Sequence, residues 1–376
     1  MELLGKTQEE LREYCLVLGE PAYRGAQIYH ALYTEKKFKL SDMTNLPVAL
    51  REKVTREATI TLPEIKQRYV STDGSVRYLL GLNAGLKPAS VEAVYMPSER
   101  RQTICISTQA GCAVDCQFCL TAQLGLIRNL TAGEIIAQVL LPLKEMSEKR
   151  WQPGSGPTDI SVEPDENPSE LGDAIQTNVV LMGQGEPLLN FDNVMSALRI
   201  LLDEEGVGLS PKRVTLSTSG IVPGIARLAK EDVRPKLAIS LNASCDGQRD
   251  ILMPINRKYP LKMLIEACQN YPLRNWEHIT FEYVMLGGVN DAPEDARRVT
   301  KWLGPLKRVK VNLIPWNPGE LPYKESGEEQ IETFRKILMD RDIPTFVRYS
   351  RGRDVMAACG QLALLEMKTS SLTVLK

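Results

Sequence analysis

The spacing of hydrophobic positions divides the first hundred residues into two parts. Up to about residue 60, apolar residues recur at helical spacing, as Leu11, Tyr14 and Leu18 do, with short polar breaks between the segments. From 60 to 99 the apolar runs are short and alternate with polar residues, which is typical of strands joined by tight turns. The pattern predicts a small helical domain at 1–60 and a short-strand extension at 61–100.

From residue 101 the pattern becomes strand, loop and helix, repeated. Amphipathic helical segments separate six predicted strands, which are RQTICIST, TNVVLMG, KRVTLST, KLAISL, HITFEYVML and KRVKVNLI. Strands that alternate with helices imply a parallel sheet with right-handed crossovers. We therefore expect an α/β fold whose core, over 101–365, is a partial (β/α)6 barrel of the TIM type. The pattern alone leaves a full barrel and an open doubly wound sheet as alternatives.

One segment interrupts this rhythm. Residues 147–177 are acidic, rich in Pro, Gly and Ser, and without periodicity, so we expect a long mobile insertion between a helix and the second strand of the core. Residues 366–376 are expected to form a C-terminal tail. The net charge is −1, but 145–173 hold eight acidic residues against two basic ones, and the rest of the chain carries +5. This permits an RNA-binding face, although an ordinary mixed-charge surface is the better explanation of the charge alone.

Composition excludes several classes of protein. No run of about twenty apolar residues is present, so no membrane span is expected. The first residues lack the basic and apolar regions of a secretory signal. The eight cysteines are bunched rather than spread as a disulfide framework, which favours a reducing, cytoplasmic compartment.

Three cysteines lie together directly after the first predicted strand of the core. Cys112, Cys116 and Cys119 occur in GCAVDCQFC, where a barrel of this kind places its active site. Thiolates suit zinc or iron–sulfur clusters, but three are too few for a closed zinc site, and His30 and His278 lie far away in sequence. A four-iron cluster on three thiolates would keep one iron open for a small molecule. Three buried cysteines acting as small hydrophobic residues are the alternative, which this spacing disfavours.

The segment CAVDCQFC resembles the Cys-x3-Cys-x2-Cys signature of radical S-adenosylmethionine (SAM) enzymes. Over residues 5 to 365 the chain also resembles the RlmN/Cfr family of RNA methyltransferases, through YRGAQIYHALY, VEAVYMP, LIRNLTAGEI, MGQGEPLLN, MPINRKY, NLIPWNP and RGRDVMAACGQL. The resemblance implies a barrel of the radical-SAM kind, a [4Fe-4S] cluster on the three cysteines, and two SAM molecules per turnover. It implies SAM contacts at Gly185, Glu186, Ser217, Ser240, Leu241, Asn242 and Asn312. Asn242 is a departure, because the family's usual form at that position is His.

The resemblance also assigns roles to residues outside the cluster loop. Cys359 would be methylated by one SAM, a 5′-deoxyadenosyl radical from a second SAM would take hydrogen from that methyl group, and the carbon radical would add to an RNA adenine. Cys105 would release the adduct through a transient disulfide with Cys359. If Ile104 and Ile106 face the outer helices, alternation turns Cys105 towards the barrel interior. Glu92 matches the family's proton acceptor, although the sequence alone also allows an ordinary acid on a strand face.

The expected activity is methylation of adenine C2 in the peptidyl-transferase region of 23S rRNA and in tRNA. Methylation of C8 of the same rRNA adenine and a non-catalytic metal-binding RNA module are the alternatives. We expect the helical domain to engage RNA, and Arg348, Arg351 and Arg353 either to contact phosphates or to form a solvated charged run. The other expected partner is an electron donor such as flavodoxin or ferredoxin, and the protein is expected to be a monomer.

Overall fold

Eleven strands form one continuous sheet whose parallel half is the barrel. The computed structural model describes residues 1–83, 87–98, 101–147, 176–362 and 374–375. The strand order is β12-β11-β10-β9-β8-β7-β4-β3-β2-β1-β13. The parallel strands are β4 (Arg101–Cys105), β7 (Gln176–Leu181), β8 (Val214–Thr218), β9 (Lys236–Ser240), β10 (Ile279–Met285), β11 (Val309–Pro315) and β12 (Thr345–Val347).

These seven strands follow one another in chain order, which decides between the predicted closures. A doubly wound sheet reverses its strand order at a switch point, whereas this order never reverses. The edge strands β12 and β13 (Val374–Leu375) do not pair with each other in the described part of the chain, so the barrel is partial. The predicted partial barrel is thus confirmed, with β12 as a seventh strand that is too short to give a periodic signal.

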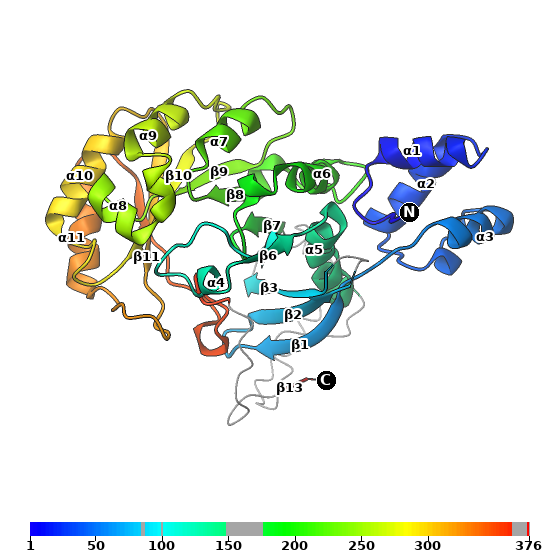
Figure 1. Ribbon diagram of the computed structural model, residues 1–376, viewed down its shortest axis with the longest axis horizontal. Helices are drawn as coiled ribbons and strands as arrows, with labels where there is room; N and C mark the ends of the chain where they lie inside the picture. The colour runs from blue at the N-terminus through cyan, green and yellow to red at the C-terminus, as the bar shows by residue number, and fades with distance from the viewer. Residues whose placement is uncertain (84–86, 99–100, 148–175, 363–373, 376) are drawn as a thin grey trace, which may run out of the picture.

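The helices between the strands cover the outside of the curved sheet (Figure 1). They are α5 (Ala132–Ser147), α6 (Phe191–Leu202), α7 (Val222–Leu228), α8 (Asp246–Leu252), α9 (Leu261–Gln269), α10 (Pro293–Leu303) and α11 (Glu328–Met339). After β4 the chain instead forms a hairpin of β5 (Gln109–Gly111) and β6 (Leu126–Asn129), which encloses the short α4 (Leu120–Gln123). None of the described helices has the length and apolarity needed to cross a bilayer.

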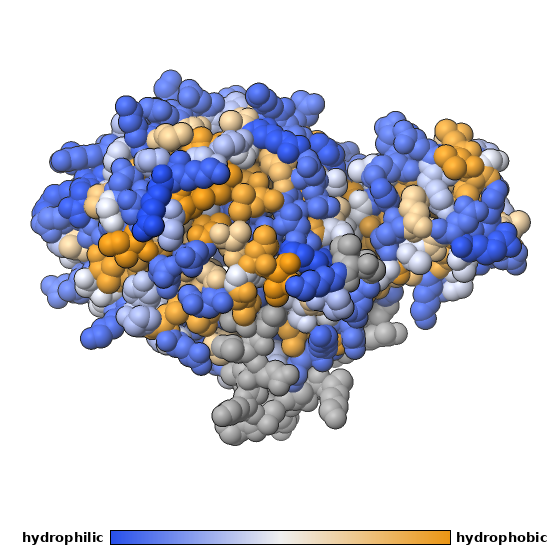
Figure 2. Space-filling model, in the orientation of Figure 1, coloured by the Kyte–Doolittle hydropathy of each residue, from blue (hydrophilic) through white to orange (hydrophobic). Residues whose placement is uncertain are grey.

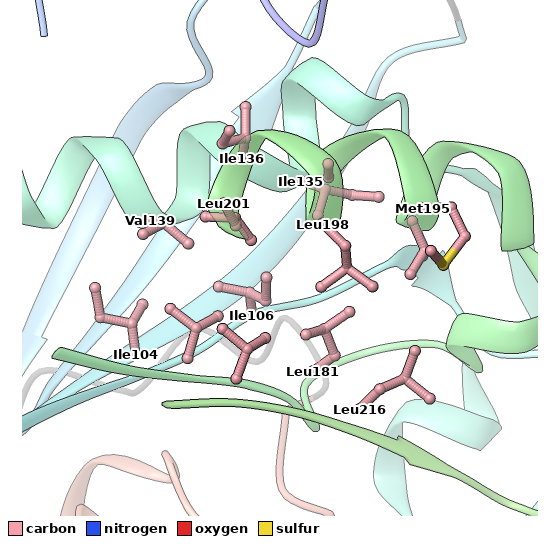
Figure 3. Packing of buried hydrophobic residues seen from close by; sticks show 14 of the residues in the cluster. Ile104, Ile106, Ile135, Ile136, Val139, Leu181, Met195, Leu198, Leu201 and Leu216 are labelled. Atoms are coloured by element: carbon pink, nitrogen blue, oxygen red, sulfur yellow. The ribbon is translucent and has the colours of Figure 1, made fainter. Parts of the chain in front are cut away.

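The main core lies between the sheet and these outer helices. Ile104 and Ile106 of the first barrel segment point up towards α5 and α6, where they meet Ile135, Leu198 and their neighbours (Figure 3). Ile104 and Ile106 are fully buried. Burial of each such side chain contributes about 1.5–3 kcal/mol, so this layer fixes which face of every strand is turned outward. The alternate residues of the strands are left to line the barrel interior.

The antiparallel strands of the predicted extension continue the barrel sheet. They are β1 (Glu64–Val70), β2 (Val76–Leu82) and β3 (Ala89–Ser98), and β3 pairs with β4 in antiparallel register. β13, within the expected tail, pairs with β1. The acidic segment expected at 147–177 lies almost wholly outside the described residues.

Three helices form a unit at one side of the barrel, next to α6 (Figure 1). They are α1 (Gln8–Val17), α2 (Tyr23–Tyr33) and α3 (Val48–Glu57), and Thr7 and Glu10 form a capping box at the start of α1. Tyr29 donates a hydrogen bond to Asp203 across the junction at 2.8 Å. The N-terminal segment crosses α5 with the two backbones in close contact at Gly133. A Cβ on Gly133 would lie 2.4 Å from the Leu4 carbonyl oxygen.

This close crossing predicts a stability defect for Gly133→Ala. The added methyl group must push the two backbones apart, so the free energy of unfolding should fall by about 1–3 kcal/mol. Gly247→Ala is the matched control, because a Cβ there meets no atom within 4 Å and alanine favours the helix by up to about 1 kcal/mol. Urea denaturation of both variants measures the difference. Equal stability of the two would show that the crossing is not tightly packed in solution.

Candidate functional site

The three predicted cysteine ligands sit on one loop whose shape depends on a glycine. Gly111 has φ +73°, and a Cβ there would lie 1.8 Å from the Gly125 carbonyl oxygen. That same oxygen accepts a hydrogen bond from the Cys112 amide at 3.1 Å. The hairpin β5–β6 therefore clamps the start of the loop, and no side chain could be accommodated at its entry. Beyond it, Cys112, Cys116 and Cys119 line a single pocket.

The chemistry of these thiols fits an iron–sulfur cluster. Burial raises the pKa of all three, that of Cys112 to about 11, and their mutual repulsion adds to the effect at Cys116. They become thiolates only if positive charge is bound beside them. In the part of the chain that the structure describes, no three His, Cys, Asp or Glu side chains are gathered tightly enough for a single metal ion. Thiolates are soft ligands of the kind that iron–sulfur clusters use.

The rest of the pocket is built from the carboxyl ends of consecutive strands, as the barrel predicts. Gly185 follows β7, Ser217 lies at the end of β8, and Ser240 ends β9. The hydroxyl groups of Ser217 and Ser240 are 3.3 Å apart. Gly185 has φ +97°, and a Cβ there would lie 2.5 Å from Gln109, so only glycine lets the backbone pass this close to the hairpin.

Glu186 is a buried carboxylate beside the thiols. It accepts hydrogen bonds from the Ser219 amide at 2.7 Å, the Ser219 hydroxyl at 2.8 Å and the Leu188 amide at 3.0 Å. Burial raises the pKa of Glu186, and these hydrogen bonds oppose the rise. The carboxylate is thus fixed in orientation within the same pocket as the cysteines, where it could accept from an ammonium group.

Asn242 is the departure from the family form. Its backbone is left-handed, with φ +54°, a conformation in which both Asn and His are enriched, so the backbone does not account for the departure. Its side-chain oxygen accepts a hydrogen bond from the Val284 amide at 2.8 Å, which ties the end of β9 to β10. Leu241 is fully buried in the main core and does not line the pocket, and its amide and carbonyl are hydrogen-bonded to Glu282 and Arg249.

Asn312 does not line the pocket, but its side chain contacts Glu282, which does. Its amide nitrogen donates to Glu282 at 2.9 Å, and its oxygen accepts from Arg348 at 3.3 Å. Glu282, which we did not predict, is the residue that faces the pocket. Burial raises the pKa of Glu282, against the opposing effects of Asn312, Lys310 and Arg348. The signal that could have identified it is an acidic residue in the middle of the apolar run HITFEYVML.

Arg249 is a second residue that sequence analysis missed. It is fully buried and donates to three backbone carbonyls, those of Ser219 at 2.6 Å, Ser240 at 3.1 Å and Leu241 at 3.1 Å. Burial lowers the pKa of Arg249 to about 10, which leaves the guanidinium charged at neutral pH. It therefore holds together the two loops that carry Ser217 and Ser240.

Cys105 and Cys359 line a second cavity, which shares a wall with the first. Cys119, Met182 and Cys359 belong to both. Cys105 packs with Val94 and Val355, on the opposite face from Ile104 and Ile106, which confirms the inward orientation predicted from alternation. Burial, together with the nearby Cys359, raises the pKa of Cys105 to about 12. All eight cysteines are free, so the two thiols are not joined by a disulfide.

Cys359 is exposed at the wall that the two cavities share. The surrounding protein, with the charge of Glu282 as a second cause, raises the pKa of Cys359 to about 11. Asn317, also missed in the sequence, donates to the Cys359 carbonyl at 3.2 Å. The Leu120 amide, directly after the third cluster cysteine, donates to the Gly360 carbonyl at 2.8 Å. The Cys359 loop is thus attached to the cluster loop through its backbone.

The turn between β1 and β2 holds the other side of the Cys359 loop. Asp73 accepts from the Gly352 amide at 2.9 Å and from the Ser75 amide at 2.8 Å. Asp354 in return accepts from the Ser71 hydroxyl at 2.6 Å. Burial opposes ionisation of Asp73, but hydrogen bonds from Ser75, Gly352 and Ser71 outweigh it and lower its pKa to about 2.

Of the remaining predicted residues, Arg348 and Arg351 line the second cavity, whereas Glu92 and Arg353 line neither. Glu92 is fully buried in an ion pair with Arg77 and is not among the residues that line either cavity. Arg351 is bound to Asp73, and Arg353 pairs with Glu325 at 3.3 Å. Arg348 stacks over Phe346 and lines the second cavity.

A thiol-lined pocket at the carboxyl edge of a partial barrel is typical of radical SAM enzymes. A family model described as the radical SAM superfamily matches residues 106–299. A second model, described as the ribosomal RNA large subunit methyltransferase N-terminal domain, matches residues 1–60. A solved structure, a radical SAM methyltransferase from Sphaerobacter thermophilus, is similar with a TM-score of 0.85 and 39% identity, covering 96% of this chain and 99% of that one.

Two relatives are similar to this protein over nearly the whole chain. A probable dual-specificity RNA methyltransferase RlmN from Koribacter versatilis is 47% identical, covering 94% of this chain and 99% of the relative. The dual-specificity RNA methyltransferase RlmN from Paracoccus denitrificans is 44% identical, covering 96% and 89%. The chain belongs to the RlmN family of radical SAM RNA methyltransferases.

The hydrogen bond from the Gly352 amide to Asp73 holds the loop that carries Cys359, so Asp73→Asn should loosen that loop. Asn has one oxygen where Asp has two. Its NH2 group must therefore face one of the two backbone amides, of Gly352 and Ser75, that Asp73 accepts from, and the negative charge is lost. Amide hydrogen exchange in residues 352–360 should therefore accelerate roughly five- to tenfold, as expected for losing a charge-assisted hydrogen bond at a half-exposed site. Asp192→Asn, which removes an exposed ion pair with Arg227, is the control. Unchanged exchange in Asp73→Asn would mean that the turn does not hold the loop.

Proposed function

We propose that this protein methylates C2 of an adenine in 23S rRNA and in tRNA by a radical mechanism. The observation that carries the proposal is that Cys105 and Cys359 line one cavity, and that this cavity shares a wall with the thiol-lined pocket. A non-catalytic metal-binding module has no use for two further thiols in that position. The names of the full-length relatives support the choice of substrates.

Cys112, Cys116 and Cys119 would hold a [4Fe-4S] cluster, and Glu186, Ser217 and Ser240 are placed to hold SAM in the same pocket. When bound, the cluster and SAM supply one-electron cleavage and hence a carbon radical. Gly185 brings the backbone close to the ligand, and Arg249 keeps the surrounding loops in place. An acidic one-electron carrier such as flavodoxin or ferredoxin would supply the electron, and the protein would act as a monomer.

Cys359 is positioned to carry the methyl group, because its sulfur stands on the wall common to both cavities. Its thiol must lose a proton before it accepts a methyl group, and the surrounding protein, which raises its pKa, makes this loss costly. Cys105 lies across the second cavity. Its sulfur, after losing a proton, would attack that of Cys359, so that an S–S bond forms while the bond from Cys359 to the RNA-linked carbon breaks. The electron pair of that bond would pass to the carbon and its base, and uptake of one proton from solvent would complete the methyl group. An external thiol must then reduce the disulfide.

The RNA would be held by groups at the edge of the second cavity. Arg348 is placed to contact a phosphate, and its position over Phe346 keeps the guanidinium at the cavity wall. An adenine must leave its base stack to enter, which favours a loop in structured RNA. The helical unit at 1–60 would provide further RNA contacts. Glu92 would act as proton acceptor only if its pairing with Arg77 opens.

Replacement of Cys359 tests the methyl carrier. Cys359→Ala should abolish RNA methylation, whereas Cys245→Ala, which alters a half-buried thiol outside both cavities, should retain it. The assay contains anaerobically reconstituted enzyme, SAM, a reductant and rRNA or tRNA, with nucleosides analysed by mass spectrometry. Failure of the unaltered enzyme to form 5′-deoxyadenosine would refute radical chemistry, and 8-methyladenosine as product would refute the choice of C2.

Replacement of Cys105 separates release from transfer. Cys105→Ala should leave protein covalently attached to RNA, because the thiol that breaks the link is missing. A gel shift that survives denaturation and disappears after nuclease treatment detects the adduct. Multiple turnovers by this variant would contradict the role given to Cys105.

A further inference from the structure

The loop that carries the three cysteines reaches the surface between apolar side chains. Leu124, Leu126 and Ile251 are 36%, 48% and 68% exposed. In Figure 2, apolar surface lies in the middle of the face shown, over α4 and β6. Single exposed hydrophobic residues are ordinary. Here three of them stand around one functional loop.

Each of these residues is tied to the loop through the backbone. Leu126 pairs with Gly111 across the β5–β6 hairpin, and Leu124 precedes Gly125, whose carbonyl accepts from the Cys112 amide. On the other side, the Gln117 amide donates to the Leu252 carbonyl at 3.0 Å, next to Ile251. The apolar side chains therefore frame the outer edge of the loop, where Ala113 and Asp115 are exposed.

Basic residues follow Ile251 in the chain, at the end of the short 3-10 helix Pro254–Arg257 that comes after α8. Arg257 and Lys258 are exposed, and neither forms an ion pair with an acidic side chain among the described residues. The acidic residues of α8 are engaged locally, since Asp250 and Asp246 both accept from Asn256, at 2.7 and 3.0 Å. The surface made of Leu124, Leu126, Ile251, Arg257 and Lys258, which we name the loop-side surface, is thus apolar with a basic margin.

We infer that the loop-side surface is the docking site of a small acidic one-electron carrier protein. The inference rests on the proposed function, because that function needs an electron delivered to a cluster on Cys112, Cys116 and Cys119. Electron tunnelling falls steeply with distance, so the carrier must dock where the cluster loop meets the solvent. One electron leaves the reduced centre of the carrier and enters the cluster, and no atom is transferred.

The composition of the surface favours a protein over RNA. Weak redox complexes use small contacts with an apolar centre and a charged margin, and a basic margin steers an acidic carrier. RNA binding depends instead on several cations that neutralise phosphates. The loop-side surface has only two cations, Arg257 and Lys258, and both belong to its margin rather than to its apolar centre.

Stopped-flow reduction of the cluster tests the inference without measuring catalysis. Reconstituted enzyme is mixed with a recombinant bacterial flavodoxin in its fully reduced state, and bleaching of the cluster absorbance is followed. Ile251→Glu and Lys258→Glu should each slow reduction by about tenfold, the lower end of electrostatic steering effects. Sodium dithionite, a small reductant with no need to dock, should reduce every variant at the unaltered rate.

Matched variants separate docking from a general change of charge. Met263→Glu and Lys301→Glu make the same charge changes at exposed positions on α9 and α10, and should leave reduction by flavodoxin unchanged. Equal slowing in these controls, or slowing with dithionite as well, overturns the inference, as does an unaltered flavodoxin rate in Ile251→Glu and Lys258→Glu. Loss of RNA affinity in those two variants with normal reduction would assign the surface to RNA.

The test also distinguishes failure of the docking site from failure of the proposed function. Normal methylation driven by dithionite, with no flavodoxin effect in the variants, would refute only the docking site. Normal reduction by flavodoxin without methylated RNA would refute only the function.

Discussion

A backbone hydrogen bond, from the Leu120 amide to the Gly360 carbonyl, joins the two halves of the site at 2.8 Å. Leu120 follows the third cysteine of the cluster loop, and Gly360 follows the cysteine proposed to carry the methyl group. The two loops belong to opposite ends of the barrel sequence, so no local propensity brings them together. The bond holds only because other contacts place the second loop, namely those of Asn317 with the Cys359 carbonyl and of Asp73 with the Gly352 amide. Both cavities take their common wall from this arrangement.

The barrel could be predicted because its strands have two chemically different faces. Ile104 and Ile106 face the helices, and the residue between them faces inward, so alternation was enough to orient Cys105. The same reasoning placed Gly185, Ser217 and Ser240 at one edge, since the carboxyl ends of parallel strands meet there. Alternation could not show that the sheet continues beyond β4 into the antiparallel strands β3, β2 and β1. Short apolar runs at 64–98 indicate strands, but nothing in them says that they extend the barrel sheet.

The residues missed in the sequence are those that act through tertiary contacts. Arg249 donates to carbonyls of two other segments, and Asn317 donates to a residue 42 positions away. Neither is distinguishable by spacing or residue type from a surface polar residue. Asn312 shows the converse, because the family resemblance implied a direct ligand contact for this residue, whereas its side chain, in the middle of β11, contacts Glu282. Position at the active edge of a barrel predicts proximity to the site, and the hydrogen-bond partner decides which side chain faces it.

Glu282, Asn312 and Arg348 form a chain that runs from one cavity to the other. Glu282 lines the first cavity, Arg348 lines the second, and Asn312 accepts from Arg348 while it donates to Glu282. Arg348 and Lys310 both favour the charged form of Glu282 against the cost of burial, and Glu282 in turn disfavours the thiolate of Cys359. The ionisation of Cys359 therefore depends on charges in both cavities. Because such coupling acts equally in both directions, whatever neutralises Arg348 in the second cavity also changes the electrostatics of the first.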